Sequence, residues 1–385
     1  MKYIRDFKLW KDVLYLLISA DIKPRLPRGA PEPFEKADQV YVLAFEVSGK
    51  FLQENPIRGV PADPYAPALF AAGGIALYTP DLTSLSPALH LAYSGTAYAG
   101  QARAEYARYA VDSTGTLSEI VAPTAVDPAG LCGAPTDCEF RAIGLGGRPS
   151  PDQPPRIYLG GWLKPAGDTA DFLAVQVDAD GVPAPSFGSG GATIVDFPAS
   201  PLPEEFGRLL TVVAGSGKAE PETIYLAGEI NGTCARGAGI VKLSADGSVD
   251  PLFGVDGRGR WFSPDASSPD GPECLGSGNL IRLRGGVVLD GDRLVFAGLR
   301  ERGVTWPATG VESDALLTSI DRRSGEVKAK GLVSYEAGAR TRDSGLTDLI
   351  TTRQGAYIAT GSIRVPLWSI PAGTSQVATV ALKMN

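Results

Sequence analysis

Carboxylates are the residues of this sequence best suited to chemistry, and they form two close pairs. The pairs are Glu204 with Glu205, and Glu312 with Asp314, all in stretches expected to be loops. Two carboxyl groups that face each other across a cleft can cleave a glycosidic bond. No spacing rule brings either pair across a cleft, so the catalytic residues stay unassigned. A carboxylate- or calcium-dependent hydrolase or lyase remains the alternative function.

Metal and nucleophile motifs are weak. Asp178-Ala-Asp180-Gly181 places two carboxylates before a glycine, as calcium loops do, but no Glu completes the loop and a hairpin turn explains the same residues. The single histidine, His90, excludes a histidine-based metal cluster and is expected to lie at a strand end. No nucleophile elbow or phosphate loop is present. The sequence therefore predicts no metal ligands and no cofactor, and leaves calcium open.

The four cysteines bear on the compartment. Cys132 and Cys138 enclose a short polar loop suited to a disulfide, and Cys234 and Cys274 lie in longer loops that could be tied together. Disulfides indicate a secreted, periplasmic or cell-surface protein, and free thiols are the alternative. No apolar run is long enough for a membrane span. The N-terminal 20 residues fit either a signal peptide or a strand.

Composition favours a β protein with many turns. The 385 residues include 47 Gly and 31 Pro, and 44% are hydrophobic, which is enough for a large core. The 36 basic and 43 acidic side chains give a net charge of −7. This balance argues against a nucleic-acid partner, because such proteins need a basic surface.

Self-similarity is the most informative feature. Apolar runs end in Asp/Ser-Gly turns, with glycines 66, 66, 66 and 78 residues apart, at Gly49, Gly115, Gly181, Gly247 and Gly325. Another apolar run precedes each of these, and most copies end in a glycine, at Gly95, Gly161, Gly228, Gly298 and Gly361. With a further run on each side, every unit has four strands. Four strands in a fixed long period are typical of a β-propeller.

The expected fold is therefore all-β, a six-bladed β-propeller of four-stranded antiparallel blades in one domain. The predicted blades are roughly 1–65, 66–135, 136–200, 201–270, 271–340 and 341–385. The last unit lacks a fourth strand, so its open edge could pair with a strand of a neighbouring chain or domain. Residues 4–10 form either the first strand of the first unit or the missing outer strand of the last one.

Two segments carry a resemblance to a known family. Ser244–Gly254 reads SADGSVDPLFG, and 178–188 reads DADGVPAPSFG. These segments resemble the bacterial delta-sixty repeat, clearly over about 171–254 and weakly elsewhere. The resemblance implies a propeller-like secreted or surface protein and implies no particular chemistry.

The long loops point to binding. In a four-stranded meander, the loops after the second and fourth strands share one face, and here these loops are long. Three tryptophans are assigned to that face, Trp162, Trp306 and Trp368, where indoles could stack on a ligand. The favoured function is a binding or interaction module for a carbohydrate, a peptide or a protein. A ring of carboxylates or a bound ion in the central funnel would favour the enzyme instead.

Overall fold

The computed structural model describes most of the chain. The described ranges are 2–22, 37–56, 70–78, 87–96, 102–132, 136–147, 155–197, 204–213, 221–231, 236–254, 260–262, 280–302, 312–333, 343–351, 357–364 and 376–382.

Within these ranges, consecutive strands form antiparallel sheets. The first sheet is β1 (Lys2–Trp10), β2 (Val13–Ile22), β3 (Ala37–Glu46) and β4 (Phe51–Pro56). The second is β5 (Phe70–Tyr78), β6 (Ala88–Thr96), β7 (Ala102–Val111) and β8 (Leu117–Ala125), followed by the short helix η1 (Pro128–Gly130). The third is β9 (Asp137–Gly146), β10 (Arg156–Lys164), β11 (Asp171–Val177) and β12 (Ala192–Val195).

The later sheets repeat this plan. The fourth is β13 (Glu204–Val213), β14 (Thr223–Asn231), β15 (Arg236–Ser244) and β16 (Arg260–Phe262). The fifth is β17 (Leu280–Asp290), β18 (Arg293–Arg302), β19 (Glu312–Asp321) and β20 (Val327–Val333). The last is β21 (Asp343–Thr351), β22 (Tyr357–Arg364) and β23 (Gln376–Leu382). The strands of each sheet fall within one of the ranges proposed for a blade.

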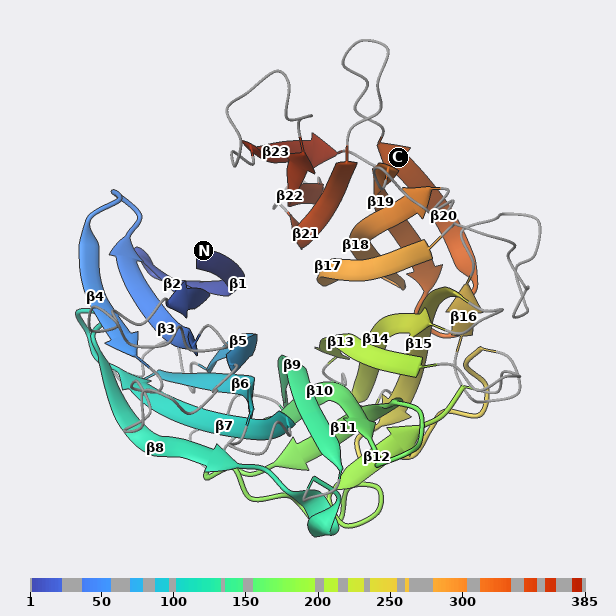
Figure 1. Cartoon of the computed structure of the whole chain (residues 1–385), viewed down its shortest axis with the longest axis horizontal. Helices are drawn as coiled ribbons and strands as arrows, with labels where there is room; N and C mark the ends of the chain where they lie inside the picture. The colour runs from blue at the N-terminus through green and yellow to red at the C-terminus, as the bar shows by residue number, and fades with distance from the viewer. Residues whose placement is uncertain are drawn as a thin grey trace, which may run out of the picture.

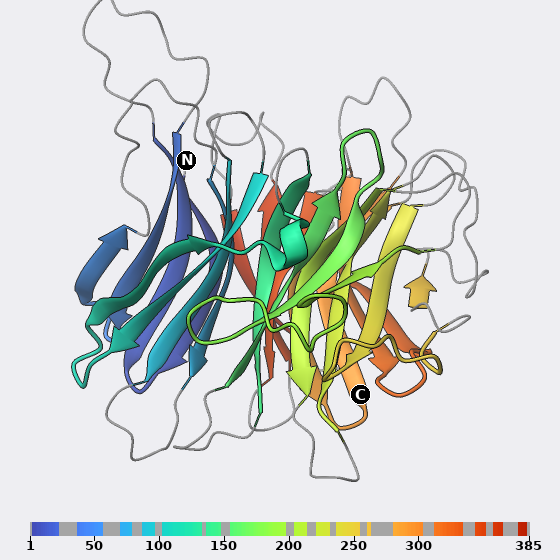
Figure 2. The ribbon, with the colours of Figure 1, turned by 90° about the horizontal axis from the view of Figure 1, so that it is seen from below.

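The sheets lie around a central axis, with the first strand of each nearest the middle (Figure 1). Seen from the side, the strands run between the two faces of the ring (Figure 2). Neighbouring sheets pack through their inner strands, β1 on β5, β5 on β9, β9 on β13, β13 on β17 and β17 on β21. The architecture is a β-propeller, and the all-β prediction is confirmed.

The prediction of six four-stranded blades is wrong. In the described part of the chain five sheets have four strands, and the last sheet, β21–β23, has three. The number of turn glycines agrees with this count of complete blades, because each turn glycine joins the third strand of a sheet to its fourth. Five such glycines, from Gly49 to Gly325, correspond to five complete blades.

Residues 2–22 form the first hairpin of the first sheet. β1 pairs with β2 starting from Trp10 and Val13, and Lys11 takes a φ of 51° in the turn between them. Tyr15 and Leu17 on β2 are fully buried in the core shared with the second sheet. These residues are therefore core strands of the first blade, and they do not supply an outer strand to the last sheet. Among the described residues, no helix is long and apolar enough to cross a membrane.

The five predicted hairpin turns are present. Each turn glycine has a positive φ, between 75° and 91°, which glycine adopts without strain. In each turn the glycine N–H donates to a carbonyl oxygen three or four residues earlier, over 2.8 to 3.1 Å. The Asp/Ser-Gly pattern thus predicted the third-to-fourth strand connections correctly.

Three of these turns rest directly on the preceding sheet. A Cβ added at Gly115 would lie 2.7 Å from Val13 Cγ2, and one added at Gly181 would lie 2.7 Å from Tyr106 Cδ1. At Gly247 the added Cβ would lie 2.7 Å from the backbone nitrogen of Gly188. Glycine is therefore needed at each of these positions for two reasons, the positive φ and the close approach of the neighbouring sheet. The turn of the first sheet differs, because a Cβ at Gly49 would meet none of the described residues within 4 Å.

Tyrosine hydroxyls of the preceding sheet donate to three of the five hairpin turns, those at Gly115, Gly181 and Gly325. Each hydroxyl donates to a turn carbonyl that the neighbouring sheet shields from water, so both groups have a hydrogen-bond partner. The three bonds are Tyr15 to Gly115 O (3.0 Å), Tyr106 to Ala179 O (3.3 Å) and Tyr225 to Arg322 O (2.7 Å).

The Phe-Gly pairs of the repeat strengthen these contacts in the third and fourth sheets. Phe187 and Phe253 are fully buried, and their rings lie 5.7 Å from Tyr158 and 5.9 Å from Tyr225, respectively. The glycine of each pair donates a backbone hydrogen bond to the hairpin turn of the following sheet. Gly188 N donates to Asp246 O over 2.7 Å, and Gly254 N donates to Ser324 O over 3.2 Å.

The histidine is a buried structural residue inside β6. His90 is 1% exposed, and its Nδ1 lies 2.7 Å from the Tyr106 hydroxyl that bonds the turn of the third sheet. Burial, followed by the nearby positive charge of Arg108, lowers the pKa of His90 from 6.5 to about 3. The imidazole is therefore neutral, and it holds the tyrosine rather than acting as a base.

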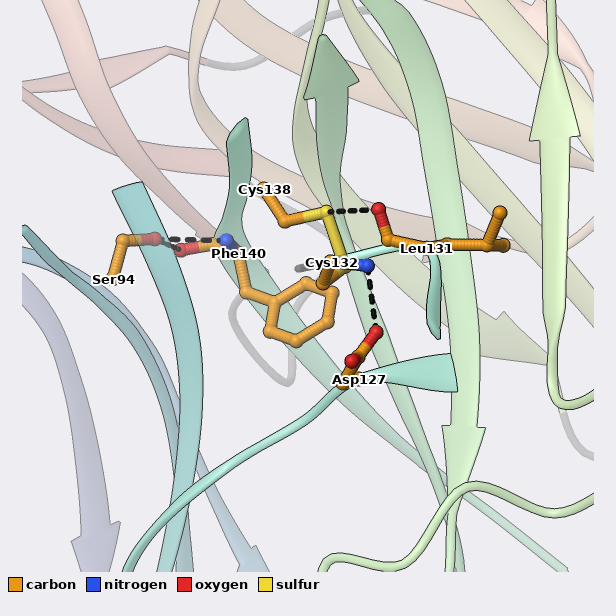
Figure 3. Close-up of a disulfide and its surroundings, with 6 residues drawn as sticks. All are labelled: Ser94, Asp127, Leu131, Cys132, Cys138 and Phe140. Carbon is orange, nitrogen blue, oxygen red and sulfur yellow. Dashed lines mark hydrogen bonds between the residues drawn. A yellow bond between two sulfur atoms is a disulfide. The ribbon is translucent and has the colours of Figure 1, made fainter. Parts of the chain in front are cut away.

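The predicted Cys132–Cys138 disulfide is confirmed (Figure 3). It ties the segment after η1 to the start of β9, across the connection between the second and third sheets. Cys132 N donates to Asp127 Oδ1 over 2.7 Å. On the other side, Ser94 Oγ accepts from Phe140 N at 2.9 Å and donates to Phe140 O at 3.2 Å. The start of β9 is thus fixed by two independent contacts.

We call the contact between a hairpin turn and the preceding sheet a seam. Substitutions at two turn glycines test whether the seam contributes to stability. Gly115→Ala and Gly49→Ala each place a methyl group at a positive φ, which costs about 1 to 2 kcal/mol. Only Gly115→Ala also forces that methyl group against Val13, which adds about 1 to 3 kcal/mol. We expect urea unfolding to show a greater loss of stability for Gly115→Ala. Equal losses would contradict a seam at this turn.

His90 predicts a dependence of stability on pH. The unfolded chain binds a proton at His90 below about pH 6.5, whereas the folded protein does so only near pH 3. This contribution to stability is complete above pH 6.5 and falls with pH, by about 1.4 kcal/mol per pH unit. In urea unfolding at pH 7.0, 5.5 and 4.5, His90→Gln should therefore lose less stability on acidification than the unaltered protein. Parallel pH profiles would show that His90 is protonated in the folded state.

Candidate ligand-binding site at the inner strands

Every inner strand has a register shift, a β-bulge or a similar irregularity, in its pairing with the second strand of its sheet. In β9, Phe140 pairs with Gly161 and Ala142 pairs with Gly160, which leaves Arg141 as the extra residue. The other inner strands have register shifts at the corresponding place, and the residues skipped there are Arg5, Gly73, Arg208, Arg284–Gly286 and Thr347. A bulge redirects side chains locally and is common beside functional sites. Four of the six bulges therefore contain an arginine near the axis.

Two of these arginines have described side chains, and each is held by a glutamate. Arg141 forms an ion pair with Glu139 on the same strand. Arg208 meets Glu229 of β14 at two points, with Nε 3.1 Å from Oε1 and Nη2 3.3 Å from Oε2. The side chain of Glu229 is 1% exposed, whereas that of Arg208 is 26% exposed. The glutamates therefore anchor the guanidinium groups from inside and leave them facing partly toward solvent.

The two bulges lie next to each other in the ring. The β9 bulge is opposite Gly161, and a Cβ at Gly161 would lie 1.8 Å from Glu139 O. A Cβ at Gly207, the residue before Arg208, would lie 2.1 Å from Gly161 O. Only glycines allow the backbones to approach so closely. The glycine contacts place the two bulges side by side.

Trp162 belongs to the same region. It was expected in a loop, but it lies within β10, directly opposite Glu139 on β9 and Phe172 on β11, and is half-buried. Glu139 and Trp162 lie toward the ends of their strands that connect to the long loops. We call Glu139, Arg141, Trp162, Arg208 and Glu229 the inner-strand cluster.

The inner-strand cluster is suited to polar recognition. A guanidinium carries five N–H donors in a planar fork that matches carboxylate oxygens, and a two-point contact to one glutamate uses only part of this fork. An indole beside it offers an apolar face for a sugar ring or a similar group. This combination can orient a ligand that is rich in oxygen acceptors.

The other predicted site residues have different positions. Trp306, Trp368, Cys234 and Cys274 lie outside the described residues. The carboxylate pairs expected in loops fall in strands, Glu204 and Glu205 in β13 and Glu312 and Asp314 in β19. These two pairs belong to different sheets.

The proposed calcium loop is a hairpin turn. Asp178 Oδ1 accepts hydrogen bonds from Asp180 N and Val182 N, both over 2.9 Å, while Asp180 lies 3.7 Å from Arg108. These carboxylates therefore stabilise the turn and the seam with the second sheet. Within the described part of the chain, no group of three or more His, Cys, Asp or Glu side chains is arranged to hold a metal ion.

Comparisons with known proteins leave the function open. No family model matches the sequence, and no curated protein matches it. Solved structures that resemble the chain include a glycosyl hydrolase from Bacteroides ovatus, with 9% identity over 100% of this chain and 86% of the other, and a TM-score of 0.41. A PL25 ulvan lyase bound to a GlcA(1-4)Rha3S saccharide has 11% identity over 93% and 78%, with a TM-score of 0.44. A glucose dehydrogenase has 13% identity over 86% and 92%, with a TM-score of 0.40. With every score below 0.5, these likenesses do not bear on ligand, reaction or site.

Proposed function

We propose that this chain is a binding module that engages its ligand at the loop-bearing end of the inner strands. The observation that supports this proposal is the pair of arginines on adjacent bulges. Arg141 and Arg208 are each fixed by a glutamate and remain 23% and 26% exposed. Fixing an arginine in advance lowers the entropy that a ligand must otherwise remove on binding.

The ligand is rich in carboxylate or hydroxyl oxygens, and an acidic polysaccharide is the class that we favour. Guanidinium groups recognise carboxylates, and Trp162 can cover one face of a sugar ring. Glu139 and Glu229 each hold an arginine side chain in place, and this positioning role favours binding over the hydrolase or lyase alternative.

We also propose that the protein works outside the cytoplasm and that residues 171–254 are delta-sixty repeats. The disulfide between Cys132 and Cys138 supports the first point, because such bonds persist in oxidising compartments. The assignment of delta-sixty repeats is supported by two Phe-Gly pairs that make equivalent contacts. Phe187-Gly188 and Phe253-Gly254 each bury a ring in their own sheet and bond the next turn.

The binding proposal predicts the behaviour of a charge-neutral double variant. Arg208→Gln with Glu229→Gln removes the guanidinium without leaving a buried carboxylate alone. In affinity electrophoresis through gels containing polygalacturonate, we expect binding to weaken at least tenfold, equivalent to about 1.4 kcal/mol. Neutral xylan should retard the unaltered protein less than polygalacturonate does.

The matched control is Glu326→Gln with Lys328→Gln. This exposed ion pair lies at the turn of the fifth sheet, 2.7 Å apart, and its removal also conserves net charge. The control should bind polygalacturonate like the unaltered protein, and both variants should keep their thermal unfolding transitions. Equal binding by the Arg208 variant would contradict the proposal. Release of new reducing ends or unsaturated products from polygalacturonate would support the enzyme alternative instead.

A further inference from the structure

The bulge that contains Arg141 is held in place by the sheet before it. Ser94 of β6 is 2% exposed, and its hydroxyl accepts from Phe140 N over 2.9 Å and donates to Phe140 O over 3.2 Å (Figure 3). A hydroxyl can make both bonds because it is a donor and an acceptor at once. Phe140 directly precedes Arg141, so one side chain of the second sheet fixes both backbone polar groups beside the bulge.

The disulfide fixes the same strand two residues earlier. Cys138 is fully buried and is joined to Cys132, whose backbone N–H donates to Asp127 Oδ1 over 2.7 Å. The residue before this aspartate, Val126, donates its N–H to Ala104 O of β7 over 2.9 Å. The covalent bond therefore connects the first residues of β9 to the second sheet.

Glu139 lies between these two anchors. Side chains alternate between the two faces of a strand, and Cys138 and Phe140 both lie in the core shared with the second sheet. Glu139 therefore points to the opposite face of β9, where Trp162 is its neighbour on β10. A shift of one residue turns every side chain of a strand to its other face. The two anchors thus determine where the ion pair of Glu139 with Arg141 lies.

Arg141 depends on this support more than Arg208 does. Arg208 meets Glu229 on β14, so its position follows from the pairing of two strands. Arg141 meets Glu139 two residues earlier on its own strand, so the ion pair moves as a unit with the start of β9. The extra residue of a bulge is also left out of the ladder of backbone hydrogen bonds, so strand pairing does not fix Arg141 directly.

We propose that the Cys132–Cys138 disulfide and Ser94 are positioning groups of the binding site, which set ligand affinity through Arg141. This inference rests on the proposed binding function. Cys138 and Ser94 are too deeply buried to contact a ligand themselves. Removing either group lets the pair of Glu139 and Arg141 adopt several positions, and a ligand that binds only one of them then binds more weakly. Ligand affinity therefore depends on whether the disulfide has formed.

Two variants test this inference in the polygalacturonate gels. Cys132→Ala with Cys138→Ala removes the disulfide, and Ser94→Ala removes both bonds to Phe140. Each should weaken binding at least fivefold. The matched control is Tyr225→Phe, which removes a buried hydroxyl that donates to Arg322 O over 2.7 Å at another seam, and it should bind normally. Unchanged binding by the disulfide and Ser94 variants would overturn the inference.

A double-mutant cycle separates positioning from a general loosening of the ring. When Glu139→Gln and Arg141→Gln are already present, loss of the disulfide should change binding less than twofold, because the group that it positions is gone. In the Arg208→Gln, Glu229→Gln background, the same loss should still weaken binding at least fivefold. Equal losses in the two backgrounds would contradict a role through Arg141.

Hydrogen exchange provides a readout that needs no ligand. In both variants, amides of residues 137–143 should exchange faster than in the unaltered protein, whereas those of residues 204–213 should be unchanged. Unchanged exchange at 137–143 would overturn the inference. If the unaltered protein does not bind polygalacturonate, the proposed function fails, and the inference fails with it. If the unaltered protein and the variants bind equally, only the inference fails.

Discussion

The close contact of the hairpin turns at Gly115, Gly181 and Gly247 with the sheet before them is the constraint on which the packing of the sheets depends. At Gly115, Gly181 and Gly247 the backbone has a positive φ and also lies where no side chain fits. A substitution at any of these positions would strain the turn and separate two sheets at once. Because a four-stranded sheet with solvent on both faces cannot bury its apolar residues, the seams make the blades into one core.

The inner strands carry a second set of contacts, at the bulges. Ser94 bonds both backbone groups of Phe140, Asp6 Oδ2 accepts from Ile75 N at 2.9 Å, and Gly161 lies against Gly207. The first four sheets are therefore joined, each to the next, at two levels, near the hairpin turn and near the axis. The bulges that allow the inner contact also bring Arg141 and Arg208 together. The candidate binding cluster is thus a consequence of how the sheets are joined.

The sequence predicted the outer contacts better than the inner ones, for a physical reason. A positive φ needs glycine, so the hairpin turns leave a regular trace at Gly49, Gly115, Gly181, Gly247 and Gly325. A bulge needs no particular residue, and its six occupants include arginine, glycine and threonine, so the pattern of Arg141 and Arg208 could not be recognised. In the second sheet, Tyr93 rather than Gly95 is opposite the bulge, so the second-strand glycines do not mark the bulges in every sheet. Trp162 was assigned to a loop because the apolar run was taken to end at Gly161, whereas β10 continues to Lys164.

The two faces of the ring differ in how far their polar groups are already bonded to a neighbouring sheet. At the hairpin turns, carbonyl oxygens and glycines are occupied by the neighbouring sheet, as Tyr225 to Arg322 O illustrates, so these turns are poorly placed to bind a ligand. At the strand ends that lead to the long loops, by contrast, the side chains of Trp162, Arg141 and Arg208 remain partly exposed.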